Sequence, residues 1–221
     1  MTLRAGFQGE LDQLRLQVEV MAVRVAQNLE RMEAALRTGD VAPADAALAA
    51  DDDIDAMLVS LTERCYDLLA REAPVAGDLR FIVSVLRVLE ELERIGDLAL
   101  RVVKQSAEHA LLAGRPHILE RLVAMATLAR DLHRTALDAW SAQDVHVAFG
   151  LLERSREMDD HYRLLVEDLL VLSGDSSARI AIVAVVMGRA LGRIGDHTVI
   201  VGERLRYLLT GDPAYLASEV R

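Results

Sequence analysis

Cysteine and aromatic residues are scarce in this sequence, and each shortage excludes a class of protein. The single cysteine, Cys65, excludes an internal disulfide framework and suits a reducing compartment. Aromatic residues make up only 4% of the chain, which leaves few rings on which nucleic-acid bases could stack. The formal net charge is −10, and neutralising the phosphates of a nucleic acid requires a basic face instead. We therefore expect no nucleic-acid partner.

Long apolar runs are missing as well. Apolar residues make up 52% of the chain, yet no run approaches the roughly eighteen residues that cross a bilayer. No charged and then apolar signal segment opens the sequence. We expect a cytoplasmic protein that is peripheral to a membrane only through protein partners.

The four prolines, at positions 43, 74, 116 and 213, act as punctuation between periodic segments. A proline inside a helix costs about 3 kcal/mol, so helices should avoid these positions. No stretch between turn signals alternates with period two, so no sheet is expected. Six long helices are predicted, at residues 5–38, 43–72, 76–113, 116–141, 144–172 and 177–210.

The second half of the chain repeats the first. Arg94–Asp97 and Arg193–Asp196 both read Arg-Ile-Gly-Asp and lie 99 residues apart. Upstream, matched residues such as Asp55 and Asp159 lie 104 residues apart, and the register changes only once, near the loop at 173–177. A constant register broken once, in a loop, is the pattern that a duplicated unit leaves.

Three helices per repeat, joined by short loops, should pack antiparallel. We therefore predict an all-α fold of two tandem three-helix bundles related by approximate symmetry. The predicted limits of the two bundles are residues 1–114 and 115–221.

Two acidic pairs are the best candidates for a binding site. Glu93 and Asp97 are four residues apart, so they share one helix face, and Asp51 and Asp55 have the same spacing. If the helices that carry them are antiparallel neighbours, the pairs converge into an oxygen-rich site. Such a site suits hard cations or iron.

Other interpretations of these residues stay open. The acids could form a solvated helix face, or Arg94 and Arg101 could neutralise them. His161 and His197 stand beside aspartates, where each could be a ligand or a structural residue. Cys65 lacks a neighbouring histidine, and no nucleophile elbow, phosphate-binding loop or Glu-x-x-His pair occurs. We expect no enzymatic activity, with a carboxylate-bridged metalloenzyme, a metal-storage protein and a plain helical scaffold as the alternatives.

Three segments together resemble the PhoU family, which regulates high-affinity phosphate uptake: residues 74–80, 92–97 and 193–212. The resemblance covers nearly the whole chain, in the same order and with the same duplication. It implies a negative regulator of the phosphate-starvation response that connects the phosphate ABC transporter with a sensor histidine kinase. The ATPase subunit of the transporter is the expected docking partner, and a homodimer is expected.

The resemblance also implies metal clusters held by Glu/Asp-x-x-x-Asp motifs, with iron, zinc, manganese or magnesium as the metal. Carried over by position, the first cluster corresponds to Asp51, Asp55, Glu93 and Asp97. The second corresponds to Ser155, Asp159, Gly192 and Asp196, of which only the two aspartates are carboxylates. The second cluster is therefore expected to be weak or vestigial, or to use Asp160 or His197 instead.

Overall fold

The computed structural model of the protein describes residues 2–220, with side chains described from residue 6 to residue 216. Within residues 2–220 every regular element is a helix, which confirms the predicted all-α class. Residues 1 and 221, the outer limits of the two predicted bundles, lie outside the described residues. The elements are α1 (Thr2–Thr38), α2 (Val41–Ala49), α3 (Asp51–Glu72), α4 (Ala76–Val103), η1 (Ser106–Glu108), α5 (His109–Ala113), α6 (Pro116–Ala142), α7 (Val145–Leu170), α8 (Ser177–Thr210) and η2 (Pro213–Val220).

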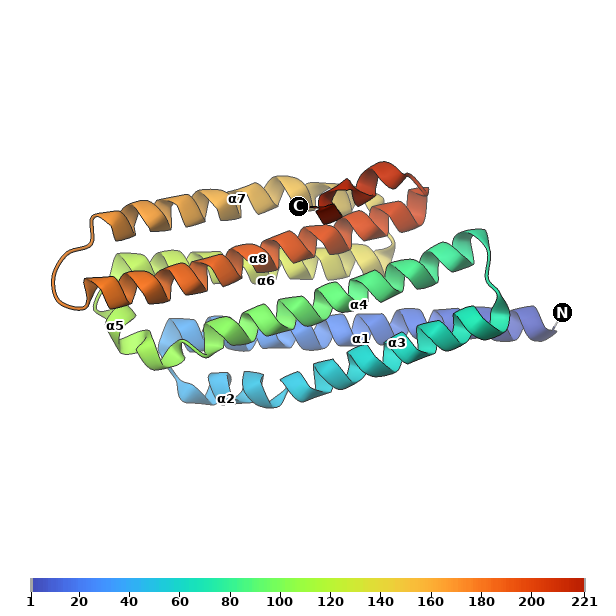
Figure 1. The fold of residues 1–221 in the computed structure, drawn as a ribbon, viewed down its shortest axis with the longest axis horizontal. Coiled ribbons are helices and arrows are strands. Elements are labelled where there is room, and N and C mark those ends of the chain that lie inside the picture. Colours follow the sequence, from blue (N-terminus) through green and yellow to red (C-terminus); the bar gives the residue numbers. More distant parts are fainter. Residues whose placement is uncertain (1, 221) are drawn as a thin grey trace.

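The long helices lie side by side along the long axis of the molecule (Figure 1). Helices α1, α3 and α4 pack on one another, and α6, α7 and α8 form a second such group. The two groups join mainly where α4 packs on α8 and α1 packs on α6, and α4 and α8 run antiparallel through the centre of the view. One hydrophobic core runs through both groups. The predicted limits at 114 and 115 stay a prediction.

Capping residues explain where several helices begin. The side chain of Asp40 accepts a hydrogen bond from the backbone N–H of Ala42, at 3.0 Å, at the start of α2. Asp144 does the same for His146 at the start of α7, at 2.8 Å. An N-cap of this kind satisfies a backbone donor that has no partner inside the helix. Pro116 is the first residue of α6, where its missing N–H costs nothing.

The single helix predicted over residues 43–72 is wrong, because the chain forms two helices there, α2 and α3, with Ala50 between them. Pro43 lies in the first turn of α2, where backbone N–H groups have no helical partner. The first turn of α3 contains the acids of Asp51–Asp53, whose negative charge stabilises a helix N-terminus. The acidic run therefore starts a helix as well as offering carboxylates.

The helix predicted over residues 76–113 is too long. Helix α4 ends at Val103, and the chain continues through η1 into the short helix α5, which buries Leu112 completely. The ring of His109 lies against Gly39, which has a φ of +72°, and a Cβ at Gly39 would collide with that ring. Burial of Leu112 and this close approach direct the chain away from the axis of α4. The C-terminal η2 is a further element that periodicity did not predict.

His133, on α6, ties the two groups of helices together and should make stability depend on pH. Its imidazole is buried, and Nε2 lies 3.0 Å from the carbonyl oxygen of Ala22 on α1. Burial lowers the pKa of His133 below the ordinary histidine value of 6.5, although the hydrogen bond to Ala22 opposes the shift. Below about pH 6.5 the unfolded chain therefore takes up a proton that the folded chain resists, so stability falls as pH falls.

This expectation is checked by urea unfolding of the wild type and of His133→Gln between pH 7.5 and pH 5.5. The variant should lose less stability over this range than the wild type. His146→Gln, on the exposed surface of α7, is the control and should keep the wild-type slope. Equal slopes in all three proteins would contradict the assignment.

Candidate functional site

The first turns of α3 and the second half of α4 bring the four acids of the first predicted cluster together. Gly96, which is buried, lies between the two α4 acids in the sequence. Asp51 Oδ1 lies only 4.0 Å from the position that a Cβ on Gly96 would occupy. We name this set the first acid group, and its members are Asp51, Asp55, Glu93 and Asp97.

Each acid of the first acid group lies in the electrostatic field of the others. Partial burial raises the pKa of Asp51, and the negative charges of Asp55 and Asp97 raise it further. Burial also raises the pKa of Glu93, followed by the charges of Asp97 and Asp55. Lys104 and Arg94 act in the opposite direction on Asp51 and Glu93, respectively, as smaller contributions. The group therefore repels itself when all four carboxyls are ionised.

The donor set of the first acid group fits a hard cation, because it consists of carboxylate oxygens alone. Among the side chains that the structure describes, however, no three His, Cys, Asp or Glu residues stand ready to hold a metal ion. Arg94, considered above as a neutralising partner, forms its ion pair with Glu91 instead, at 3.8 Å. Asp55 and Asp97 are exposed, as the interpretation of a solvated face requires.

The second predicted cluster lies on the wall of a cavity of about 380 Å³ between α4, α7 and α8. Ser155, Asp159 and Asp196 line it, and nothing lies within 4 Å of a Cβ built on Gly192. Burial raises the pKa of Asp196, and the nearby charge of Arg193 lowers it. Two carboxylates and one hydroxyl are a poorer set of cation ligands than the four carboxylates of the first acid group.

The substitute ligands considered for the second cluster have other partners. Asp160 is exposed and pairs with Arg163, at 3.6 Å. His197 is buried, and its Nδ1 lies 2.5 Å from Oε2 of Glu91. His197 therefore links α8 to α4.

Four arginines dominate the lining of the same cavity, which we name the arginine pocket. From the sequence, Arg94 was named only as a neutralising partner and Arg193 only within the repeated motif, and the other two were not named. Among the side chains described, the acids on its lining are Asp159 and Asp196. The pattern of the duplication could have indicated this difference, because the residue matched with Asp52 at a distance of 104 is an arginine, Arg156. The four arginines of the pocket are Arg87, Arg94, Arg156 and Arg193.

The sequence analysis also missed Glu91, which is completely buried at the junction of α4 and α8. Arg87 lies 2.8 Å from its Oε1, and His197 contacts its other oxygen. A signal was present, because Glu91 falls on the apolar stripe of α4 between Val88 and Ile95. A charged residue at a core position usually has a specific partner.

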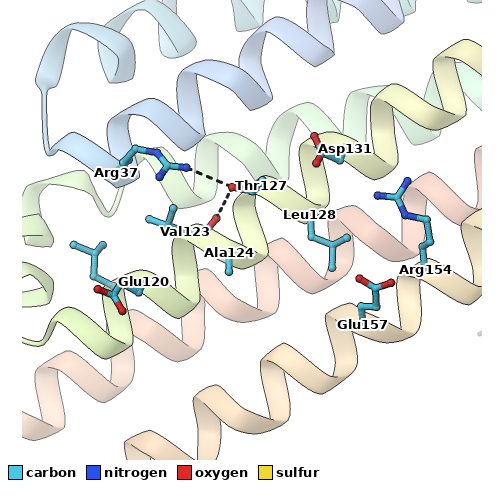
Figure 2. A pocket seen from close by; sticks show the side chains of 10 residues that line it. Arg37, Glu120, Val123, Ala124, Thr127, Leu128, Asp131, Arg154 and Glu157 are labelled. Carbon is cyan, nitrogen blue, oxygen red and sulfur yellow. Dashed lines mark hydrogen bonds between the residues drawn. The ribbon is translucent and has the colours of Figure 1, made fainter.

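A larger hollow, of about 620 Å³, lies over α6 and α7 near the end of α1 (Figure 2). Figure 2 shows Arg37 reaching toward Thr127, while Arg154 and Glu157 border the other side. Thr127, on the lining of this hollow, donates a hydrogen bond of 2.8 Å to Glu33, a buried acid. The described residues that line this hollow include no cysteine, serine or histidine.

Cys65 is completely buried in α3, and burial raises its pKa to about 12. It is therefore a protonated thiol at neutral pH and unsuited to nucleophilic chemistry. Within residues 2–220, none of the helices combines the length and apolar character that spanning a bilayer requires.

Comparison with known proteins confirms the resemblance seen in the sequence. The PhoU domain model matches residues 18–106 and 122–205, one segment in each half of the chain. The phosphate-specific transport system accessory protein PhoU of Escherichia coli (strain K12) is 28% identical over 210 residues, which cover 93% of this chain and 86% of that protein. The homolog 1 of this accessory protein in Thermotoga maritima is 31% identical over 212 residues, covering 93% of this chain and 89% of the relative.

The fold agrees with the sequence comparison. The crystal structure of PhoU from Pseudomonas aeruginosa matches with a TM-score of 0.88 and 26% sequence identity. The match covers 93% of this chain and all of the other, 100%. From the two matched segments, the relatives and the shared fold, it follows that this chain belongs to the PhoU family.

Proposed function

We propose that the protein is a cytoplasmic accessory protein of high-affinity phosphate transport and a negative regulator of the phosphate-starvation response. The observation that carries this proposal is the match over 93% of the chain to relatives named as phosphate-specific transport system accessory proteins. In this role the protein holds phosphate-starvation genes off when phosphate is plentiful.

The output of such a protein is contact rather than catalysis. The hollow over α6 and α7 has no cysteine, serine or histidine among its described lining residues, and Cys65 is a buried thiol. We infer that it docks on the ATPase subunit of a phosphate ABC transporter and on a sensor histidine kinase. With a net charge of −10, it suits partners with basic patches. Charge complementarity sets encounter rate and specificity, so this docking weakens as salt rises.

Helix α1 carries an apolar stripe that suits protein contact. Leu16, Val20 and Val23 are 60%, 50% and 43% exposed, and their spacing puts them on one helix face. Contiguous exposed apolar surface is typical of interaction sites. We propose that a partner, or the second subunit of a homodimer, covers this stripe.

We propose further that the first acid group holds a metal ion such as iron, zinc, manganese or magnesium. A cation there relieves the mutual repulsion of the carboxyls and fixes the start of α3 on α4. Asp159 and Asp196 remain candidates for a second, weaker site, which lacks two of the four carboxylates of the first.

Deletion of the gene tests the regulatory proposal. The deletion strain should express phosphate-starvation genes in phosphate-rich medium, measured with a reporter, and a plasmid copy of the wild-type gene should restore repression. Purified protein should bind the ATPase subunit at low salt, bind it more weakly at high salt, and show no hydrolase activity.

Normal repression in the deletion strain, with no second copy of the protein in the genome, would contradict the regulatory proposal. Turnover by the purified, metal-loaded protein would favour the alternative of a carboxylate-bridged metalloenzyme. Several metal ions per chain, with repression unaffected by the deletion, would favour metal storage.

A further inference from the structure

The arginine pocket concentrates positive charge in an acidic protein. Four of the 25 basic residues of the chain line this one cavity, and only two acids line it with them. Its lining comes from α4, α7 and α8, and α8 packs on α4 of the other half. A cavity with converging guanidinium groups and a positive lining attracts anions.

Comparison of the two halves shows that the pocket differs from the first acid group in charge and in space. At matched positions, Asp51 and Asp52 are replaced by Ser155 and Arg156. Gly192 stands where the first half has a glutamate, and no atom lies within 4 Å of a Cβ built on it. The second half therefore exchanges carboxylates for open space and a guanidinium.

A buried network anchors one wall of the pocket. Arg87 lies 2.8 Å from Glu91, which is completely buried. The distance between an Nη atom of Arg193 and Nε2 of His197 is 3.4 Å. Because a guanidinium can only donate, Nε2 accepts this long hydrogen bond, and the Nδ1–H of His197 donates to Glu91.

Other arginines of the pocket keep donors for a ligand. Arg193 contacts Asp196 only at 3.7 Å, and Arg156 forms no ion pair with any residue that the structure describes. A guanidinium has five N–H donors, and its planar fork matches the oxygens of phosphate.

We propose that the arginine pocket binds a protonated tetrahedral oxyanion of the phosphate class, either the free ion or the protonated, monoanionic phosphate group of a small ester. The guanidinium groups of Arg156, Arg193 and Arg94 contact its charged oxygens. Asp196 or Asp159 accepts a hydrogen bond from its protonated oxygen. Hydrogen phosphate has such an O–H group at neutral pH and sulfate has none, so the aspartates select phosphate over sulfate. The inference stands on the pocket alone and does not require the regulatory function proposed above.

The test is calorimetric titration of metal-free, tag-free protein with inorganic phosphate, glycerol 3-phosphate and sulfate. The titrations are made at about pH 6, close to the second pKa of a phosphate monoester, so that the ester also carries an O–H group. One equivalent of phosphate or of the ester should bind, and the tighter of the two identifies the form of the ligand. Sulfate should bind at least about tenfold more weakly, because it leaves an aspartate facing an oxygen that cannot donate.

Arg156→Gln and Arg193→Gln should each weaken phosphate binding by about tenfold, since each removes charge-assisted hydrogen bonds. Both residues are exposed enough for the variants to fold, which their circular dichroism and thermal unfolding would verify. The control is Arg163→Gln, on α7 like Arg156 but outside the pocket. It makes the same change in net charge and should leave the affinity within about twofold.

Because the titrated protein is metal-free, binding of phosphate through a metal ion at the first acid group is excluded. No binding of phosphate or ester by the wild type at millimolar concentration would overturn the proposal. Equal loss of affinity in Arg156→Gln and Arg163→Gln would also overturn it, because binding would then follow net charge rather than the pocket. Equal affinity for sulfate and phosphate would overturn the selection by aspartate.

Discussion

Replacing Asp97 by asparagine should weaken binding of divalent or ferric metal by at least about tenfold, while Asp196→Asn changes it little. Asp97 contributes to the raised pKa of both Asp51 and Glu93, so it lies within the field of the first acid group. A cation bound among four carboxylates loses one of its charged ligands in the variant. At the matched position, Asp196 has a single acid partner, Asp159, and faces arginines.

The measurement is calorimetric titration of tag-free, chelator-treated protein with Fe, Mn, Zn and Mg. Asp53→Asn is the matched control. Asp53 is exposed on the first turn of α3, the turn that carries Asp51, but it pairs with Arg24, at 2.7 Å. The control should keep wild-type affinity. Equal affinity and stoichiometry in the wild type and in Asp97→Asn would show that the first acid group is not the metal site.

A gain of function completes this test. Ser155→Asp with Gly192→Glu gives the second half the four carboxylates of the first, and open space surrounds Gly192. The double variant should bind one more metal ion per chain than the wild type. If it binds no more, the carboxylate count does not explain the difference between the halves.

The sequence carried enough information for the first acid group and too little for the arginine pocket. Asp51 and Asp55 share one helix face, Glu93 and Asp97 share another, and a short loop makes the two helices neighbours. Local spacing and one short connection therefore predict the group. The arginine pocket depends instead on which faces of α4 and α8 meet, and these helices belong to different repeats. Apolar periodicity gives each helix a buried stripe without naming the partner that covers it.

The wrong helix limits have a related cause. Nothing between 103 and 109 contains a proline or a glycine, so the predicted helix continued to residue 113. The structure ends α4 at Val103 because Leu112 is buried and His109 packs on Gly39, both away from the axis of α4. The break at Ala50 was not predicted because the acids after it were interpreted as ligands or as a solvated face and not as a helix start. Tertiary contacts decided the first limit, and charge at a helix N-terminus favours the second.

Glu91→Ala should be the most destabilising single substitution among the acids of this protein, at about 3–5 kcal/mol of unfolding free energy. Glu91 is completely buried, and its carboxylate contacts Arg87 on α4 and His197 on α8. Removing it leaves the Nδ1–H of His197 without its acceptor and takes from Arg87 its buried counter-charge. Glu91→Gln keeps an acceptor for His197 while removing the charge, so it should fall between the wild type and Glu91→Ala.

Urea unfolding at constant pH measures the effect as a shift in midpoint at unchanged slope. The matched control is Glu90→Ala, because Glu90 is exposed and pairs with the same Arg87, at 2.9 Å. An exposed pair of this kind contributes at most about 1 kcal/mol. Equal midpoints for Glu91→Ala and Glu90→Ala would show that the buried pair does not stabilise the junction of α4 and α8. A large difference would instead show that one residue, absent from both acidic motifs, holds the two repeats together and supports the wall of the arginine pocket.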